Sequence, residues 1–258
     1  METIQVQRSE GIVTIILDRP EVKNAIDGTM WDELLRTFRS IYERPDDRVV
    51  VLTGAGGEFC SGADVRTMGA SVDERSALAA MREVSDVALA LHRLPQPVIA
   101  KVRGVAAGAG CNLALAADLV VASSSARFSE IFSRRGLSVD FGGTWLLPRL
   151  VGLHRAKELA FFADVLSADE VHAMGLLNRV VPDDTLDGVV DEWASRLAAG
   201  PPLALSMTKK MLNESMANGM EQAVEEEARS QAVNFGTTDT AEAIQAFLNR
   251  RDPRFEGR

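Results

Sequence analysis

Short runs of β-branched apolar residues alternate with segments of helical periodicity through the first half of the chain, and this alternation constrains the fold most. Strands are expected over residues 11–17, 49–53, 97–102 and 119–122, and helices over 29–43, 73–94 and 107–117. Residues 3–8 also alternate, which predicts a hairpin that turns near Ser9, Glu10 and Gly11. Apolar strands that alternate with helices are typical of βαβ units with both sheet faces covered. The sequence therefore predicts an α/β fold.

After about Asp140 the pattern becomes almost wholly helical. Helices are expected near residues 153–163, 168–175, 183–199, 201–217 and 219–249, and only the run 179–181 is typical of a strand. We therefore divide the chain of 258 residues into an α/β core over residues 1–200 and a helical C-terminal region over residues 201–258. We expect the second region to pack on the core or on a neighbouring subunit.

Charge and cysteine content exclude several classes of protein. The formal net charge of −9 disfavours nucleic-acid binding, because contact with phosphates needs a basic face. Two cysteines cannot form a disulfide framework, and no signal peptide is evident, so we expect a cytoplasmic protein. The apolar stretch 105–122 contains Asn112 and Asp118, which favours buried core over a membrane span.

Two glycine clusters follow predicted strands, at Gly54-Ala55-Gly56 and Gly108-Ala109-Gly110. A dinucleotide loop needs a third glycine, and these clusters have Phe59 and Leu113 there instead. Glycine-rich turns can also point backbone N–H groups at an anion, or simply close tight turns, and the spacing leaves both open. The three histidines match no metal-ligand spacing, so no metal site is expected.

Motifs spread from Ile4 to Phe255 agree in order and spacing with one family. They are 17–20 (LDRP), 24–26 (NAI), 52–54 (LTG), 59–65 (FCSGADV), 97–100 (PVIA), 108–111 (GAGC), 117–118 (AD), 142–144 (GGT) and 173–176 (AMGL). In these motifs the chain resembles the crotonase superfamily, which is the enoyl-CoA hydratase/isomerase family. The resemblance implies a crotonase-type β-β-α spiral core with a helical C-terminal trimerisation region. It also implies homotrimers or dimers of trimers.

The same resemblance implies an acyl-CoA thioester as substrate, with no cofactor beyond the CoA of that substrate. Its thioester oxygen is expected to be held by the backbone N–H groups of Ala63 and Ala109. The family usually has glycine at the second position, and alanine keeps this N–H in place if its φ is negative. Further residues are expected near the CoA moiety, namely Lys23, Ala25, Ala63, Asp64, Val65 and Arg250.

Both glutamates that typical hydratases of this family use are replaced here, by Asn112 and Phe132. We expect these two residues to contact the substrate, but neither can act as a base. Glu130 lies two residues before Phe132 and shares its face if the segment is extended. We interpret Glu130 as a surface or structural carboxylate, and as a weak substitute for the missing acids.

Asp140 offers a different acid, just before the glycines at 142–143. On its own this position is typical of a helix N-cap. The resemblance to family members with a single aspartate, such as the enoyl-CoA and 1,2-epoxyphenylacetyl-CoA isomerases, favours a catalytic role instead. A nucleophilic role, as in the family's haloaroyl-CoA dehalogenases, is a further alternative. Phe132 is expected to exclude water and to raise the pKa of Asp140.

These residues favour isomerisation of an enoyl-CoA, because one carboxylate can remove an α-proton and return it at the γ carbon. Hydration needs water and proton delivery together, for which two carboxyl groups are better suited. The alternatives are therefore an enoyl-CoA hydratase, a non-catalytic acyl-CoA binder, and a serine hydrolase on the same fold. Met68 and Met81 are expected beside Phe132 in the acyl pocket, and the range 68–90 as a mobile lid.

Overall fold

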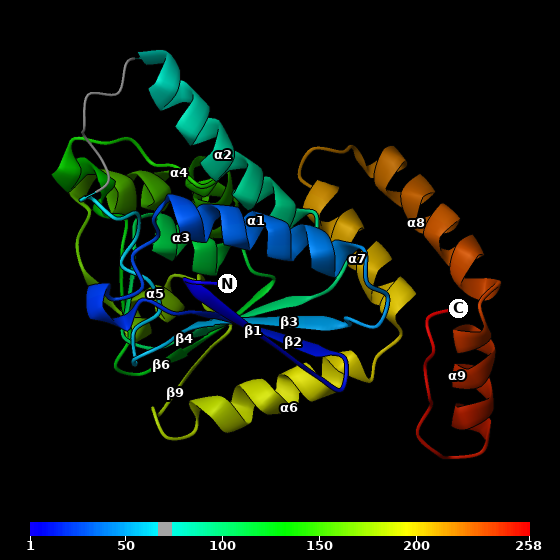
Figure 1. The fold of residues 1–258 in the computed structure, drawn as a ribbon. Coiled ribbons are helices and arrows are strands. Elements are labelled where there is room, and N and C mark those ends of the chain that lie inside the picture. The colour runs from blue at the N-terminus through cyan, green and yellow to red at the C-terminus, as the bar shows by residue number, and fades with distance from the viewer. Residues whose placement is uncertain (67–73) are drawn as a thin grey trace.

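A computed structural model describes residues 1–66 and 74–258. Its centre is a six-stranded sheet in the order β1-β2-β3-β4-β6-β9 (Figure 1). The strands are β1 Ile4–Ser9, β2 Ile12–Leu17, β3 Val49–Gly54, β4 Val98–Val102, β6 Leu119–Ser123 and β9 Arg179–Val181. Only the β1–β2 pair is antiparallel, with Ser9 opposite Ile12, and the remaining pairs are parallel. The predicted hairpin and the α/β class are confirmed.

Helices cover both faces of this sheet, because its parallel strands are apolar on both sides. The helices α1 Gly28–Tyr42, α2 Glu74–His92 and α3 Ala109–Leu115 lie over one face, and α6 Leu186–Ala198 lies over the other (Figure 1). Side chains alternate accordingly along β3. Val50 and Leu52 belong to the larger core, whereas Val49 and Val51 pack in a second cluster with α6.

A second sheet of three short strands stands beside the first. Its strands are β5 Val105–Ala107, β7 Arg127–Ser129 and β8 Leu166–Ser167. The predicted helix over residues 107–117 is therefore wrong at its start, since residue 107 ends β5 and α3 begins at Ala109. Gly108 separates the two elements with a φ of 53° and a ψ of −126°, a conformation that favours glycine.

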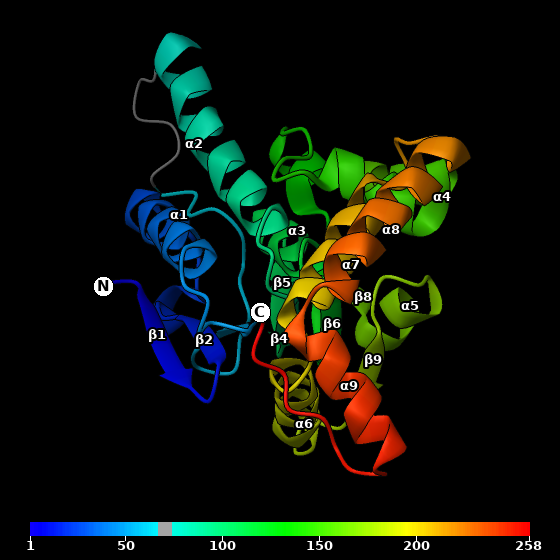
Figure 2. The ribbon, with the colours of Figure 1, turned by 90° about the vertical axis from the view of Figure 1, so that its right-hand side faces the viewer.

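The remaining elements are helices, and helices dominate the chain after Asp140, as expected. The elements are η1 Pro20–Val22, η2 Ile131–Arg135, α4 Gly143–Phe162, α5 Ala168–Ala173, α7 Pro202–Glu214, α8 Met220–Phe235 and α9 Thr238–Leu248. The single helix predicted over 219–249 is wrong, because α8 ends at Phe235 with Gly236 as its C-cap, and the Thr237 side chain caps α9. Figures 1 and 2 show α7 to α9 together on one side of the sheet.

The apolar stretch 105–122 lies in the core, as its polar residues indicated. Asp118, near its end, accepts a hydrogen bond from the backbone N–H of Val98 at 2.7 Å and pairs with Lys209 at 2.7 Å. In the described ranges, no helix is long and apolar enough to cross a bilayer.

Side-chain hydrogen bonds of Asn24 connect the loop after β2 to the loop after β3. It is fully buried, and its φ of 55° lies in the left-handed region, which asparagine tolerates better than most residues. Its side-chain oxygen accepts from the Arg19 N–H at 3.0 Å. Its amide nitrogen donates to the carbonyl groups of Ala55 at 2.9 Å and Glu58 at 2.7 Å. One side chain therefore satisfies three backbone groups.

We expect Asn24→Ala to lower the free energy of unfolding by about 3 kcal/mol or more. Each buried backbone group left without a partner costs about 1–3 kcal/mol, and alanine is also strained at this φ. Denaturant unfolding would measure the change. Asn249→Ala is the matched control, because Asn249 is exposed and donates a single side-chain bond, to Gln245, at 2.8 Å. A loss below about 1 kcal/mol for Asn24→Ala would contradict this account.

Candidate active site

A cavity of about 370 Å³ opens where the loops after β2, β3 and β5 meet the segment around η2. Its volume lies within the range of small-molecule sites. Seven residues predicted for the site lie on its wall, namely Ala25, Ala63, Asp64, Val65, Ala109, Phe132 and Asp140. The structure thus brings together residues that are more than a hundred positions apart in the sequence.

A neighbouring bridge sets the direction of the backbone N–H of Ala63. Ile26 and Ala63 form an isolated parallel bridge. In it, Ile26 donates to the Gly62 carbonyl and accepts from the Asp64 N–H, both at 2.8 Å. The peptide groups on either side of Ala63 are used in this way, so the N–H of Ala63 itself faces away from Ile26. Ala63 lies on the cavity wall, and we infer that its N–H points into the cavity.

The N–H of Ala109 is available for a different reason. Ala109 is the first residue of α3, and the first N–H groups of a helix have no intrahelical acceptor. Its φ is negative, so the replacement of the family's glycine by alanine leaves the N–H in place. Gly62 brings the two segments together: a Cβ atom there would lie 2.8 Å from the Ala107 oxygen and 3.7 Å from the Ala109 nitrogen. The two N–H groups therefore flank one part of the cavity.

Asp140 reaches the wall from a strained turn before α4. Phe141 has a φ of 49° and Gly142 a φ of 78°, both in the left-handed region. Phe141 is buried and stacks on Trp31 of α1, with ring centroids 5.5 Å apart. This packing holds the backbone in a conformation that costs about 1–3 kcal/mol. The stack thereby fixes the position from which the Asp140 side chain extends.

The N-cap alternative for Asp140 is wrong. The residue that caps α4 is Gly142, with no side-chain hydrogen bond, and the Gly143 N–H donates to the backbone oxygen of Asp140 at 2.9 Å. The carboxyl oxygen Oδ1 of Asp140 is buried and has no hydrogen-bond partner among the described residues. Burial raises the pKa of Asp140 to about 6.

Glu130 is not a surface carboxylate, and this expectation is corrected by its exposure of 4%. Its Oε2 atom accepts from the side-chain amide of Asn112 at 3.3 Å. The same amide donates to the backbone oxygen of Asp140 at 3.0 Å. Neither Asn112 nor Glu130 lines the cavity, so the direct substrate contact predicted for Asn112 is not seen in this arrangement. Burial raises the pKa of Glu130 to about 7, and the nearby Asp140 charge adds to the effect.

The charged residues expected around CoA are placed in three ways. Asp64 lies on the wall and pairs with Arg19 at 3.1 Å and Arg66 at 2.7 Å, which holds the pKa of its carboxyl below the usual range. Lys23 is largely exposed and pairs with Glu58 at 2.9 Å. In the sequence it lies between Val22 and Ala25, which both line the cavity. Arg250 follows α9 and does not line the cavity.

Sequence reasoning missed several residues of the wall, namely Val22, Ser61, Gly62, Arg66, Ala107, Gly108, Ile131, Arg135 and Leu137. Arg66 directly follows the motif at 59–65, which is the signal that could have found it. Met81 is 39% exposed and does not line the cavity. Met68 and the first part of the expected lid lie outside the described residues, and the later part of that range is α2.

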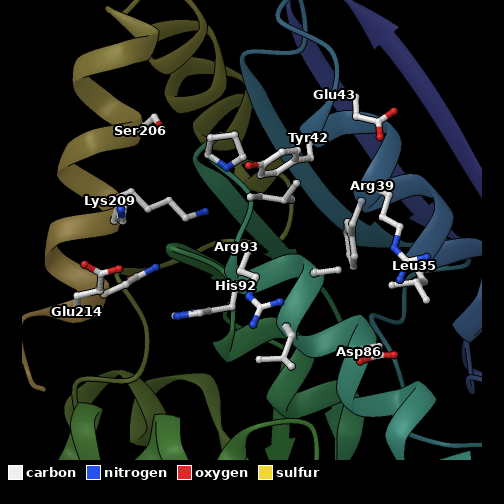
Figure 3. Close-up of a pocket in the computed structure, with 17 residues that line it drawn as sticks. Leu35, Arg39, Tyr42, Glu43, Asp86, His92, Arg93, Ser206, Lys209 and Glu214 are labelled. Atoms are coloured by element: carbon white, nitrogen blue, oxygen red, sulfur yellow. The ribbon is translucent and has the colours of Figure 1, made fainter. Parts of the chain in front are cut away.

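Size alone does not identify the site. A larger cavity of about 730 Å³ opens between α1, α2 and α7, where Tyr42, Arg93 and Lys209 are among the lining residues (Figure 3). It contains none of the residues predicted for the site. In the described part of the chain, no group of three His, Cys, Asp or Glu could hold a metal ion.

The chain is similar to known proteins in both sequence and structure. Residues 7–258 match the family model for Enoyl-CoA hydratase/isomerase. A protein of Rhodobacter capsulatus named "Probable enoyl-CoA hydratase" is 42% identical over 256 residues, which cover 99% of this chain and 98% of that protein. The 1,2-epoxyphenylacetyl-CoA isomerase of Escherichia coli is 36% identical over 263 residues, which cover all of both chains. The crystal structure of enoyl-CoA hydratase from Bacillus anthracis superposes with a TM-score of 0.95 at 32% identity and covers both chains completely.

Proposed function

The chain belongs to the enoyl-CoA hydratase/isomerase family, and from that premise we propose that it isomerises an enoyl-CoA by moving the double bond from the β,γ to the α,β position. The crotonase-type fold expected from the motifs is confirmed, and the chain is an enzyme of this family. One observation carries the choice of reaction. Among the described residues, the cavity wall has one carboxyl group with a buried oxygen that lacks a partner, Asp140, whereas Asp64 on the same wall is paired with arginines.

In the proposed reaction, Asp140 removes a proton from the carbon next to the thioester carbonyl. The electrons of that C–H bond flow toward the carbonyl and give an enolate, whose oxygen the N–H groups of Ala63 and Ala109 hold. Preorganised donors of this kind stabilise charge that develops in the transition state. Asp140 then returns the proton at the γ carbon, and the double bond ends in conjugation with the thioester. No net electron change occurs, and no cofactor is needed beyond the CoA of the substrate.

The wall also supports the placement of the substrate. Ala25 in the loop after β2 and Ala63 and Val65 in the loop after β3 give a path for the CoA arm, and Lys23 lies close to Ala25 in the sequence, where it can meet the phosphates. Phe132 lines the same cavity as Asp140 and excludes water from the reacting carbons. A dry site strengthens each electrostatic contact within it.

Hydration of a 2-enoyl-CoA is the second candidate. The observation that favours it is Glu130, a second buried carboxyl whose pKa the Asp140 charge affects. We rank it below isomerisation because Glu130 lies behind the wall and does not reach the cavity. A serine hydrolase is less well supported, since the Ser61 hydroxyl on the wall donates to the Val22 carbonyl at 3.2 Å.

We further propose that copies of this chain form homotrimers or dimers of trimers in the cytoplasm. Large apolar side chains are exposed on the helices of the second half, which indicates faces that pack on another copy. They include Leu153, Phe161 and Phe162 of α4, Phe235 of α8, and Phe247 and Leu248 of α9. Both cysteines are buried as free thiols, which suits a reducing compartment. Light scattering of the purified protein would measure the assembly.

The test of the proposed reaction follows the purified protein with a 3-enoyl-CoA and, separately, with a 2-enoyl-CoA. Absorbance reports conjugation, and mass spectrometry reports 3-hydroxyacyl-CoA. We expect conjugation of the first substrate without hydration of the second. Rapid water addition to the 2-enoyl-CoA would contradict the isomerase proposal and favour the hydratase. Binding of both thioesters without turnover would favour an acyl-CoA binder.

A further inference from the structure

A cluster of buried polar side chains lies behind the cavity wall, formed by Cys111, Asn112, Glu130 and Asp140. It contains more acceptors than donors. Oδ1 of Asn112, Oε1 of Glu130 and Oδ1 of Asp140 are all buried without a hydrogen-bond partner among the described residues. Buried acceptors without partners are costly and call for an explanation. A proton on one carboxyl converts an acceptor into a donor and relieves the excess.

Asn112 connects the two carboxyl-bearing segments of this cluster. Its amide nitrogen donates both hydrogens, one to Oε2 of Glu130 at 3.3 Å and one to the backbone oxygen of Asp140 at 3.0 Å. The amide has little freedom, because a Cβ atom on Gly143 would lie 2.4 Å from its nitrogen and 2.6 Å from its oxygen. A shift of the Glu130 carboxyl therefore reaches the turn that carries Asp140.

We propose that Glu130 is a positioning residue for Asp140: its neutral carboxyl holds the Asn112 amide against the Asp140 turn, and its ionisation lowers the activity of the site. This inference deepens the proposed isomerisation and rests on it for the role of Asp140. Glu130 is not itself a catalytic residue, because it does not line the cavity.

The charges around Glu130 and Asp140 favour a state in which one of the two carboxyls is protonated. The titratable groups that face Glu130 are Asp140 and the thiol of Cys111, which hydrogen-bonds to Glu130 and whose own pKa burial raises well above its usual value. In the described part of the chain, no Lys, Arg or His contributes to the shift of either carboxyl. Two carboxyls in one buried cluster do not both ionise readily. Burial raises the pKa of both carboxyls, but Asp140 lines the cavity whereas Glu130 is buried behind its wall, so Asp140 ionises first and serves as the base.

The proposal predicts a bell-shaped dependence of kcat on pH. Activity rises as Asp140 loses its proton, and it falls as Glu130 ionises, because a second negative charge then stands behind the carboxylate and the enolate. Glu130→Gln retains the shape and the acceptor for Asn112 but cannot ionise. We expect the falling limb to disappear in Glu130→Gln, so that kcat above about pH 8 exceeds that of the wild type by about threefold or more.

The experiment measures kcat and KM for conjugation of a 3-enoyl-CoA from about pH 5.5 to about pH 8.5. It compares the wild type, Glu130→Gln and a matched control, Glu158→Gln, whose glutamate is exposed on α4 and pairs with Arg155. We expect the control to follow the wild-type profile. A falling limb that survives in Glu130→Gln would overturn the proposal. So would a loss of activity of about 100-fold at every pH, since Glu130 would then transfer the proton itself.

Thermal unfolding gives a second readout that does not depend on activity. A carboxyl whose pKa is raised by folding stabilises the protein at low pH, and this contribution is lost as pH rises through the folded pKa. The Tm of Glu130→Gln relative to the wild type should therefore increase as pH rises from about 5 to about 8. The dependence should weaken in the Asp140→Asn background, because the like charge is gone. A pH-independent difference in Tm would overturn the proposal.

The two readouts separate this inference from the proposed function. A wild type that turns over neither thioester contradicts isomerisation, while the Tm comparison still decides whether Glu130 is a buried neutral acid coupled to Asp140. Turnover with a flat Tm difference leaves isomerisation in place and removes the role given to Glu130.

Discussion

Asp140→Asn is expected to lower kcat for isomerisation by about 10²–10⁴-fold, which is the usual contribution of a general base. Asparagine keeps the shape of the side chain on the cavity wall but cannot accept the α-proton. KM should change little, because the N–H groups of Ala63 and Ala109 and the CoA contacts remain. Conjugation of a 3-enoyl-CoA measures the loss at about pH 7, where Asp140 of the wild type is mostly ionised.

Two observations would accompany this result. Asp169→Asn, on the exposed first turn of α5, is the matched control and should retain wild-type activity. Exchange of α-hydrogens for deuterium in a saturated acyl-CoA should also be lost in Asp140→Asn, because it reports proton removal alone. Activity within about threefold of the wild type would show that another group is the base.

Ala109→Pro should lower kcat by about 10²–10³-fold, which is the effect of removing one donor from an oxyanion hole. Proline has no backbone N–H, so the substitution deletes one of the two proposed donors. The fold tolerates the change for two reasons. Proline is favoured at the first position of a helix, which Ala109 occupies in α3. The preceding residue is Gly108, which is less restricted than other residues before proline.

The comparison must separate a lost donor from a damaged helix. Met220 is the exposed first residue of α8, so Met220→Pro places proline at the same helical position away from the cavity. We expect this control to keep its activity, and we expect Ala109→Pro to unfold within a few degrees of the wild type. An Ala109→Pro protein that is folded and fully active would exclude the N–H of Ala109 from the oxyanion hole.

The order of the secondary structure could be predicted from the sequence because it depends on local pattern. β-branched runs gave the strands of the large sheet, and helical spacing gave α1 and α2. The errors fall where local pattern is weakest. The strands β5, β7 and β8 have two or three residues each and carry no period of their own. Likewise, the break between α8 and α9 depends on a glycine and a capping threonine inside a helical pattern.

The site was predictable to the extent that motifs mark it. Ala63 and Ala109 lie in glycine-rich motifs, and Asp140 precedes another, so position in the chain sufficed to nominate them. Which way a peptide group points is a different matter. The N–H of Ala63 faces away from Ile26 because Ile26 uses the peptide groups on either side of it, and Ile26 lies 37 positions earlier in the chain. Pattern within one segment cannot show such a contact.

The sequence by itself determined the family, the α/β architecture and the replacement of both usual glutamates, because these depend on residue identity and spacing. The tertiary structure alone decided what Glu130 and Asn112 do. A carboxylate after a short strand is exposed in most settings, and only the packing of α3, η2 and the Asp140 turn removes Glu130 from water. Burial raises the pKa of a carboxyl and strengthens each hydrogen bond that it makes. Residues distant in sequence create that burial, so the pattern of one segment cannot show it.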